Sequence, residues 1–195
     1  MTELERQLRQ KIAAIVDDHD WMDPTTLESI ANRIRLENAS RKTRRMKLLA
    51  LADRFNTAIA PHAACRSGCG ACCSMTTMIY AHEAEVLAKA SGRRMTRIPV
   101  RPQFTALTQA RAFFGTPCPF LKDSRCSVYE VRPIICRLHH SLNDDASACD
   151  TSVPTEERKP VGSYDVDRIE MPYHLLVRED GREEPWGEIH EFFPD

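Results

Sequence analysis

The architecture of this protein depends first on residues 65–73, which read Cys65-Arg66-Ser67-Gly68-Cys69-Gly70-Ala71-Cys72-Cys73. The cysteine spacing is C-x3-C-x2-C-C, so four thiols fall within one short loop. Gly68 and Gly70 allow the positive φ angles that tight ligand loops often require. Their backbone N–H groups are also available to donate hydrogen bonds to sulfur, as they do around iron–sulfur clusters. The loop is therefore suited to hold thiolates against a metal centre.

A second group of four cysteines follows at wider spacing: Cys118, Cys126, Cys136 and Cys149. The intervals between them are 7, 9 and 12 residues, too long for one loop, so these thiols converge only through folding. Phe120 and Leu121, close to the first of them, are suited to exclude water from a centre. We take all eight cysteines as candidate metal ligands: Cys65, Cys69, Cys72, Cys73, Cys118, Cys126, Cys136 and Cys149.

Composition and length indicate an ordinary globular protein of a reducing compartment. The chain has 195 residues, of which 42% are hydrophobic and 28% charged, enough to bury a core without disulfides. Its acidic start is unlike a signal peptide, and no apolar run is as long as a membrane span. These features predict a cytoplasmic location, where cysteines act as metal ligands rather than as disulfides. A net charge of −1 gives no general attraction to nucleic acid or membrane, and neither is expected as a partner.

The number of metal centres stays open at this level. Neighbouring cysteines such as Cys72 and Cys73 rarely ligate the same ion, because adjacent side chains diverge in extended backbone. Eight thiolates suffice for two four-cysteine centres, and one such centre with spare cysteines explains the count equally well. His139 and His140 are alternative ligands, although ordinary core or surface histidines are more common. Three arginines next to cysteines are candidates to offset the thiolate charge: Arg66, Arg125 and Arg137.

The fold is expected to be mainly α, a small helical domain with irregular cysteine-rich loops organised around the metal centre. Residues 1–61 form a helical region, because three apolar stripes follow the helical period. Asp23 and Pro24 are typical of a helix start, and a break is expected near Asn38–Ser40 if the second and third stripes are separate helices. The basic run at 41–47 is interpreted as a solvated helix face.

Residues 62–150 are expected to form the cysteine-cluster domain, and residues 151–195 a C-terminal extension that packs on the core. Near the C-terminus the pattern is compatible with a short β-hairpin, with one strand at Tyr173–Val177 and a turn at Asp180-Gly181. Trp186 to Phe193 then returns as the partner strand or as a short helix. Its aromatic residues are expected in the core.

Two kinds of metal suit such a thiol-rich site, namely zinc and the iron–sulfur clusters. Structural zinc sites usually contain two C-x2–4-C knuckles, and this sequence has no second knuckle. The pair Cys118-Pro119 is similar to the Cys-Pro that ends the bacterial ferredoxin run. The spacing therefore favours an iron–sulfur cluster, with [4Fe–4S] as the first choice and zinc as the alternative.

Three motifs in order resemble the YkgJ-type cysteine-cluster family: C-x3-C-x2-C-C, Cys-Pro-Phe-Leu and Cys-x-Val-Tyr-Glu-x-Arg-Pro-x-x-Cys-Arg. The resemblance covers about residues 62–150 and includes Tyr129, Arg132 and Pro133 besides the cysteines. Proteins of this family are described as zinc- or iron-chelating domains with eight characteristic cysteines, and they are generally small, bacterial and cytoplasmic. A related pattern occurs in flagellin lysine methylases, where an iron–sulfur cluster is associated with methyl transfer. For this shorter chain the resemblance implies metal binding only.

Three functions are compatible with these observations. The first is a metal protein with a redox, sensing or metal-handling role, whose partner is a protein client or a redox partner. The second is a structural zinc module for protein–protein interaction. The third is an iron–sulfur enzyme of methyltransferase or radical S-adenosylmethionine type, because Cys65, Cys69 and Cys72 share the C-x3-C-x2-C spacing of the latter. The strand–helix alternation of a β/α barrel is missing from the sequence, and no catalytic residue is assigned.

Overall fold

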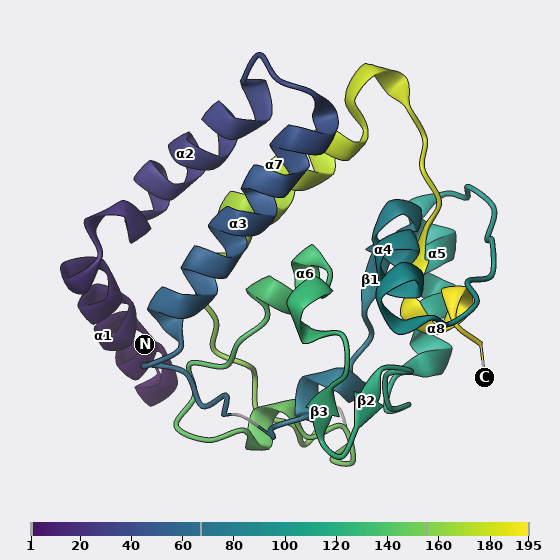
Figure 1. The fold of residues 1–195 in the computed structure, drawn as a ribbon. Coiled ribbons are helices and arrows are strands. Elements are labelled where there is room, and N and C mark those ends of the chain that lie inside the picture. Colours follow the sequence, from purple (N-terminus) through teal and green to yellow (C-terminus); the bar gives the residue numbers. More distant parts are fainter. Residues whose placement is uncertain (1, 67, 155, 195) are drawn as a thin grey trace. The chain divides into compact units, whose positions relative to one another are not determined.

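The computed structural model describes residues 2–66, 68–154 and 156–194, and it divides into two compact units. The first unit comprises Met1–Cys65, Arg137–Ala148 and Pro160–Arg182, and the second comprises Arg66–Cys136, Cys149–Lys159 and Glu183–Asp195. The segments of the two units alternate along the chain. Helices dominate both units, so the mainly α class is confirmed (Figure 1).

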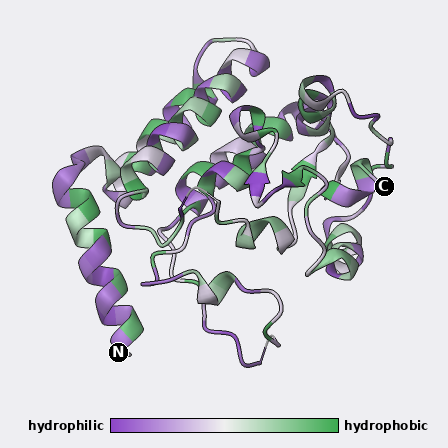
Figure 2. Cartoon of the chain, turned by 60° about the horizontal axis from the view of Figure 1, so that its bottom comes forward, coloured by the Kyte–Doolittle hydropathy of each residue, from purple (hydrophilic) through white to green (hydrophobic). Residues whose placement is uncertain are grey.

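The first unit contains α1 (Glu3–Asp18), α2 (Pro24–Leu36), α3 (Arg41–Ile59) and α7 (Asp167–Val177). The Asp23 carboxylate accepts hydrogen bonds from the amides of Thr25 and Thr26, so the expected start of α2 is confirmed. The second and third apolar stripes form two separate helices, α2 and α3, which pack against each other and against α7. Polar and apolar bands along α1 show its amphipathic pattern (Figure 2).

The basic run at the start of α3 pairs largely within its own unit. The guanidinium Nη2 of Arg44 lies 2.6 Å from the carboxylate Oε2 of Glu179, and Arg44 also donates to the backbone oxygen of Arg35. Arg41 donates to the backbone oxygen of Glu179, and Lys47 pairs with Glu37. The run therefore ties α3 to the turn that follows α7 and to the α2–α3 connection.

The second unit contains α4 (Ala81–Ser91), α5 (Gln103–Ala110), α8 (Ile189–Phe192) and two short sheets. One sheet pairs β1 (Met78–Tyr80) with β4 (Trp186–Glu188), and the other pairs β2 (Leu121–Lys122) with β3 (Arg125–Cys126); both pairs are antiparallel. The helices α4, α5 and α8 gather around the β1–β4 pair (Figure 1). Helix α6 (Ile134–Leu138) begins in the second unit and ends in the first.

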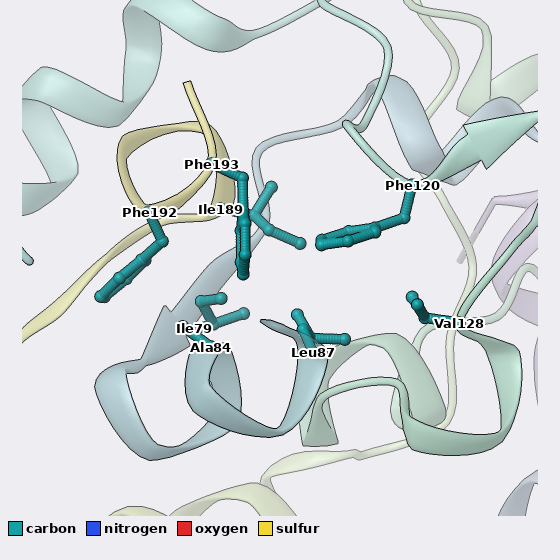
Figure 3. Close-up of a cluster of buried hydrophobic side chains, with 8 residues drawn as sticks. All are labelled: Ile79, Ala84, Leu87, Phe120, Val128, Ile189, Phe192 and Phe193. Atoms are coloured by element: carbon teal, nitrogen blue, oxygen red, sulfur yellow. The ribbon is translucent and has the colours of Figure 1, made fainter. Parts of the chain in front are cut away.

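A hydrophobic cluster forms the core of the second unit (Figure 3). Its buried members are Ile79, Ala84, Leu87, Phe120, Val128, Ile189, Phe192 and Phe193. The rings of Phe120 and Phe193 meet edge to face at 4.8 Å between centroids, a favourable aromatic geometry. The expectation that the C-terminal aromatic residues belong to the core is thus confirmed for Phe192 and Phe193, while Trp186 is only partly buried.

The strand expected at Tyr173–Val177 is wrong, because these residues complete α7. Ile169, Tyr173 and Leu176 are all buried, at the spacing of one helix face, and this period overrides the local β propensity. The C-terminal strand does form, at Trp186–Glu188, but it pairs with the distant β1 rather than with a neighbouring strand. No helix among the described residues is long and apolar enough to cross a lipid bilayer.

Candidate metal centre

The first cysteine group lies in a loop that ends in a 3₁₀ turn over Ala71–Ser74. Gly68 has a φ of +87°, as expected, but Gly70 has an ordinary φ of −98°. Gly70 is needed for a different reason: a Cβ there would lie 3.0 Å from a methyl carbon of Leu121. The absence of a side chain at Gly70 therefore lets the loop approach the hairpin of the second cysteine group. Ser67 lies outside the described residues.

Backbone contacts join the two cysteine groups directly. The amide of Cys118 donates to the carbonyl oxygen of Cys73 at 2.6 Å, and the amide of Gly115 donates to the carbonyl oxygen of Ser74 at 2.8 Å. Together with the close approach at Gly70, these bonds fasten the segment before Cys118 to the segment after Cys72. The convergence expected from folding is thus built into the main chain.

The β2–β3 hairpin positions Cys126. Leu121 stands opposite Cys126 in the antiparallel register, and a two-residue turn connects the strands. Asp123 and Ser124 have φ angles of 48° and 59°, the left-handed conformation that tight hairpin turns require. The amide of Leu121 also donates to the carbonyl oxygen of Cys118, so the hairpin begins directly from the Cys118 turn.

Cys136 is carried by α6, and the buried carboxylate of Glu83 fixes the start of that helix. One carboxylate oxygen accepts from the amide of Ile134 at 2.9 Å, and the other accepts from the amide of Tyr80 at 3.0 Å. Glu83 is only 6% exposed, so both amides would be hard to satisfy by water. The side chain therefore links the beginning of α4 to the beginning of α6.

The pKa values of the thiols show which of them influence one another electrostatically. Burial raises the pKa of Cys118 to about 11, and the neighbouring Cys126 and Cys72 add to the rise. Burial also raises the pKa of Cys136 well above its usual value, and Cys118, Cys72 and Cys126 raise it further. These four thiols, Cys72, Cys118, Cys126 and Cys136, thus form one group within the second unit. In it each ionised sulfur disfavours ionisation of its neighbours.

Cys72 and Cys73 do not diverge as expected for adjacent residues. Their thiols are hydrogen-bonded to each other, and this bond is the main cause that raises the pKa of Cys72, followed by burial. The reason is the backbone: these residues lie in the 3₁₀ turn, where side chains do not alternate between opposite faces as they do in a strand. Cys73 thus extends the group of four.

Two acidic residues near the thiols were missed by sequence reasoning, namely Glu83 and Glu188. Both raise the pKa of a thiol, Cys136 and Cys118 respectively. Glu188 is fully buried and accepts from the amides of Thr77 and His190 and from the imidazole of His190. Their positions at the starts of α4 and α8 are typical of helix-capping glutamates, which was the available sequence signal.

A cation would offset the negative charge of this arrangement. Several thiols and two carboxylates share a partly buried region, and ionised thiols there need a compensating positive charge. The amide of Phe120 also donates to the sulfur of Cys118 and lowers its pKa, an N–H···S contact that favours thiolate. By the chemistry of its donors, the group fits a thiophilic metal.

The thiols are gathered but do not form a finished coordination shell. Within the described ranges, no three or more Cys, His, Asp and Glu side chains have an arrangement that could hold a metal ion directly. Ligation therefore requires the thiols to lose their protons and rotate toward the ion. Because binding releases these protons, metal affinity is expected to rise with pH.

The remaining candidate cysteines occupy different surroundings. Cys65 is exposed and ends the first segment of the first unit. Cys69 is half-buried in the loop of the first group, and its amide donates to the carbonyl oxygen of Arg66. Cys149 is buried, at 4% exposure, in a 3₁₀ turn over Ser147–Cys149.

The hydrophobic cluster adjoins the thiols as the sequence suggested. Phe120 is buried in the cluster, and Cys118 and Cys126 pack against it. Among the arginines proposed to offset charge, Arg137 instead forms an ion pair with Asp53 in the first unit. Hydrophobic packing thus limits the access of water to the thiols. The charge of Arg137 is neutralised by Asp53 and not by a thiolate.

His140 is a core residue of the first unit. Its Nδ1–H donates to the carbonyl oxygen of Leu138 at 2.7 Å, and its Nε2 accepts from the amide of Tyr164 at 3.0 Å. Both ring nitrogens are therefore engaged in the neutral form, and the ring also meets Phe55 edge to face. Burial likewise lowers the pKa of His139 in the same unit.

Acid is expected to destabilise the first unit through His140. Burial lowers its pKa from 6.5 to about 4, so the unfolded chain binds a proton at higher pH than the folded chain does. The contribution of the neutral His140 ring to the free energy of unfolding is complete above pH 6.5 and is lost as the pH falls toward 4. This contribution amounts to roughly 3 kcal/mol in total. Titration of the His140 ring followed by NMR should give a pKa below 5 in the folded protein. A value near 6.5 would contradict the neutral core assignment.

Fold and site together define a small, mainly α-helical protein with a thiol-rich centre. The family model described as "CxxCxxCC: Putative zinc- or iron-chelating domain" matches residues 64–156. The resemblance to that cysteine-cluster family is thus confirmed over these residues. Neither the curated proteins nor the solved structures contained a match to the chain. The family description supports zinc or iron binding as the function of the domain.

Proposed function

We propose that this protein holds an iron–sulfur cluster, most readily [4Fe–4S], and acts in a redox, sensing or metal-handling role. The observation that carries the proposal is the electrostatic influence within the group of four thiols: Cys72, Cys118 and Cys126 raise the pKa of Cys136, and Cys72 and Cys126 raise that of Cys118. Four cysteines are the usual ligand number of such a cluster. The proposal assigns these four as ligands of one centre, while Cys65, Cys69, Cys73 and Cys149 stay candidates for a second centre or for exchange at the first.

Three features of the surroundings support a cluster over a bare metal ion. The Phe120 amide donates to the Cys118 sulfur, and such bonds tune iron–sulfur centres. Cys118 and Cys126 border a hydrophobic cluster, which limits water. His140, a possible alternative ligand, has both ring nitrogens engaged with Leu138 and Tyr164. When bound, a cluster supplies one-electron redox chemistry, and this chain's residues supply the thiolates, the N–H donor and the dry border.

A reducing compartment suits this assignment. The thiols of Cys72, Cys73, Cys118, Cys126 and Cys136 carry no disulfide, although two of them lie in hydrogen-bonding contact. Oxidation of such a pair would remove ligands from the proposed centre. We therefore propose a cytoplasmic location, where thiols are kept reduced.

A structural zinc site is the second candidate, and one observation favours it. The four thiols come from three separated segments, a loop, a hairpin region and a short helix, so one ion would cross-link most of the second unit. Structural zinc sites stabilise small domains in this way. Both sheets in the described residues are two-stranded and antiparallel, so these residues contain no part of the parallel barrel of a radical enzyme.

The experiment that separates these functions is a visible absorption spectrum with metal and sulfide analysis. The protein is purified without oxygen and without an affinity-metal column. A brown sample that absorbs broadly at about 400 nm and contains iron with inorganic sulfide supports the cluster. A colourless sample with stoichiometric zinc would overturn the cluster in favour of the structural site. A sample that binds neither metal under reducing conditions would refute metal binding itself.

A further inference from the structure

A long stretch of the second unit contains basic residues and no acidic residue. Between Val86 and Lys122 the sequence has neither Asp nor Glu, although the whole chain carries a net charge of −1. The basic residues of this stretch are Lys89, Arg93, Arg94, Arg97, Arg101, Arg111 and Lys122. It therefore forms a local excess of positive charge that the composition of the chain conceals.

Two of these arginines serve the fold of the second unit. Arg101 forms an ion pair with Glu191, and both side chains are largely buried. Arg93 donates to the carbonyl oxygen of Pro119 at 2.6 Å and lies over the ring of Phe120. In contrast, Arg94, Arg97 and Arg111 are exposed, so their charges face solvent.

The exposed side of α5 carries two large apolar residues, Phe104 and Leu107, among polar ones. The buried residues of α5 are Ala106 and Ala110, and the helix packs on β4. Phe104 is 80% exposed and Leu107 is 43% exposed, and their spacing of three residues places them on one face. Arg111 continues that face one turn beyond Leu107. A phenylalanine so exposed is unusual in a helix whose other side fills the core.

The segment before α5 lies over the same strand. A Cβ on Gly187 in β4 would meet the side chains of Ile98 and Arg101, so the connector passes directly over β4. The amide of Thr96 donates to the carbonyl oxygen of Phe192, which fastens the connector to α8. Arg97, next to Ile98 in this connector, is exposed to solvent.

We propose that this basic–apolar face, made of Arg94, Arg97, Phe104, Leu107 and Arg111, docks an acidic surface of a partner protein that presents apolar side chains. The arginines would pair with carboxylates while Phe104 and Leu107 enter an apolar patch. Two apolar anchors make a small contact, which suits a transient complex rather than a permanent one. The proposal does not depend on which metal the thiols hold.

The chain places this face close to the candidate metal centre. Beyond α5, the ring of Phe113 stacks on that of His190 at 5.2 Å between centroids. The His190 ring contacts the carbonyl oxygen of Pro117, the residue before Cys118. A partner docked on α5 would therefore lie near the segment that carries a candidate ligand, as delivery of electrons or metal requires.

Charge argues against a second copy as the occupant, and the short length of α5 argues against a membrane. A second copy using the same face would bring like charges together, because the stretch from Val86 to Lys122 has no carboxylate to receive them. An anionic membrane would attract the arginines, but α5 has only eight residues and its other side is fixed against β4. Interfacial helices instead lay a long apolar face into the lipid.

The test uses fluorescence anisotropy with the full chain and a labelled synthetic peptide that carries glutamates and helically spaced leucines. We expect saturable binding that weakens with salt, and a loss of affinity of about fivefold or more in Phe104→Ser/Leu107→Ser and in Arg94→Ala/Arg97→Ala. Backbone amide NMR shifts should concentrate between residues 94 and 111. Val86→Ser, an exposed apolar position on α4, is the matched control and should bind as the wild type does.

Four outcomes would overturn the proposal. The first is that the Phe104→Ser/Leu107→Ser variant binds the peptide as tightly as the wild type does. The second is that the wild type binds a peptide whose leucines are replaced by serine as tightly as it binds the original peptide. The third is dimerisation of the wild type that the same variants abolish, because it would make the face a self-association surface. The fourth is binding to phosphatidylserine vesicles, lost in these variants, without binding to the acidic peptide. Circular dichroism of each variant ensures that only folded protein is compared.

Discussion

Replacing Cys126 or Cys136 by serine is expected to remove bound metal and lower the melting temperature in the same step. Both thiols belong to the group of four, and serine keeps the size of the side chain but loses the soft ligand. Loss of a ligand should weaken metal affinity by about 100-fold or more, because even mutation of a residue that only hydrogen-bonds to a ligand lowers metal affinity by about 10- to 100-fold. Because binding couples to folding, the melting temperature should fall by roughly 10 °C.

The matched control for this prediction is Val128→Thr. Val128 lies two residues after Cys126 and is buried in the adjoining hydrophobic cluster, so a polar atom there disturbs packing without removing a thiol. It should cost about 1–2 kcal/mol and leave the metal content of folded protein unchanged. Metal content is measured by elemental analysis and stability by thermal melting without oxygen. If Cys126→Ser and Cys136→Ser kept full metal content and melting temperature, the ligand assignment would be wrong.

The helices of the first unit could be predicted because their signals are local. Asp23 followed by Pro24 gives the start of α2, and the apolar stripes give the packed faces. At Tyr173–Val177 the same method failed, since a short apolar run of β-prone residues looks alike in a strand and at the end of a helix. The partner of Trp186–Glu188 was equally hidden, because pairing with Met78–Tyr80 depends on contacts between residues far apart in the sequence.

The candidate site was partly predictable for the same reason. The spacing of the cysteines predicts that they are metal ligands. Gly70 indicates a local constraint on the backbone, and this constraint is the close approach to Leu121 rather than a positive φ. The grouping of Cys72 with three thiols of the second group was beyond the sequence, because it depends on the backbone bond from Cys118 to Cys73. Glu83 was missed because a glutamate at a helix start is common, and only its distant contact with Ile134 sets it apart.

That contact makes Glu83→Ala the second substitution with a large expected effect. It leaves the amides of Tyr80 and Ile134 without their acceptor in a buried region, at about 2 kcal/mol each. The total loss of folding free energy should therefore be about 4 kcal/mol. Since Ile134 begins the helix that carries Cys136, we also expect metal affinity to fall by about 10- to 100-fold.

Two further variants separate position from charge in this result. Glu85→Ala removes an exposed carboxylate from the same helix and should leave both stability and metal affinity nearly unchanged. Glu83→Gln removes the charge that raises the pKa of Cys136 but keeps one oxygen acceptor, so it should fall between the wild type and Glu83→Ala in stability. If Glu83→Ala melts like the wild type and binds metal equally well, then Glu83 does not hold α6. If Glu83→Gln instead loses as much metal affinity as Glu83→Ala while it remains stable, the carboxylate acts on the centre through its charge rather than through the position of Cys136.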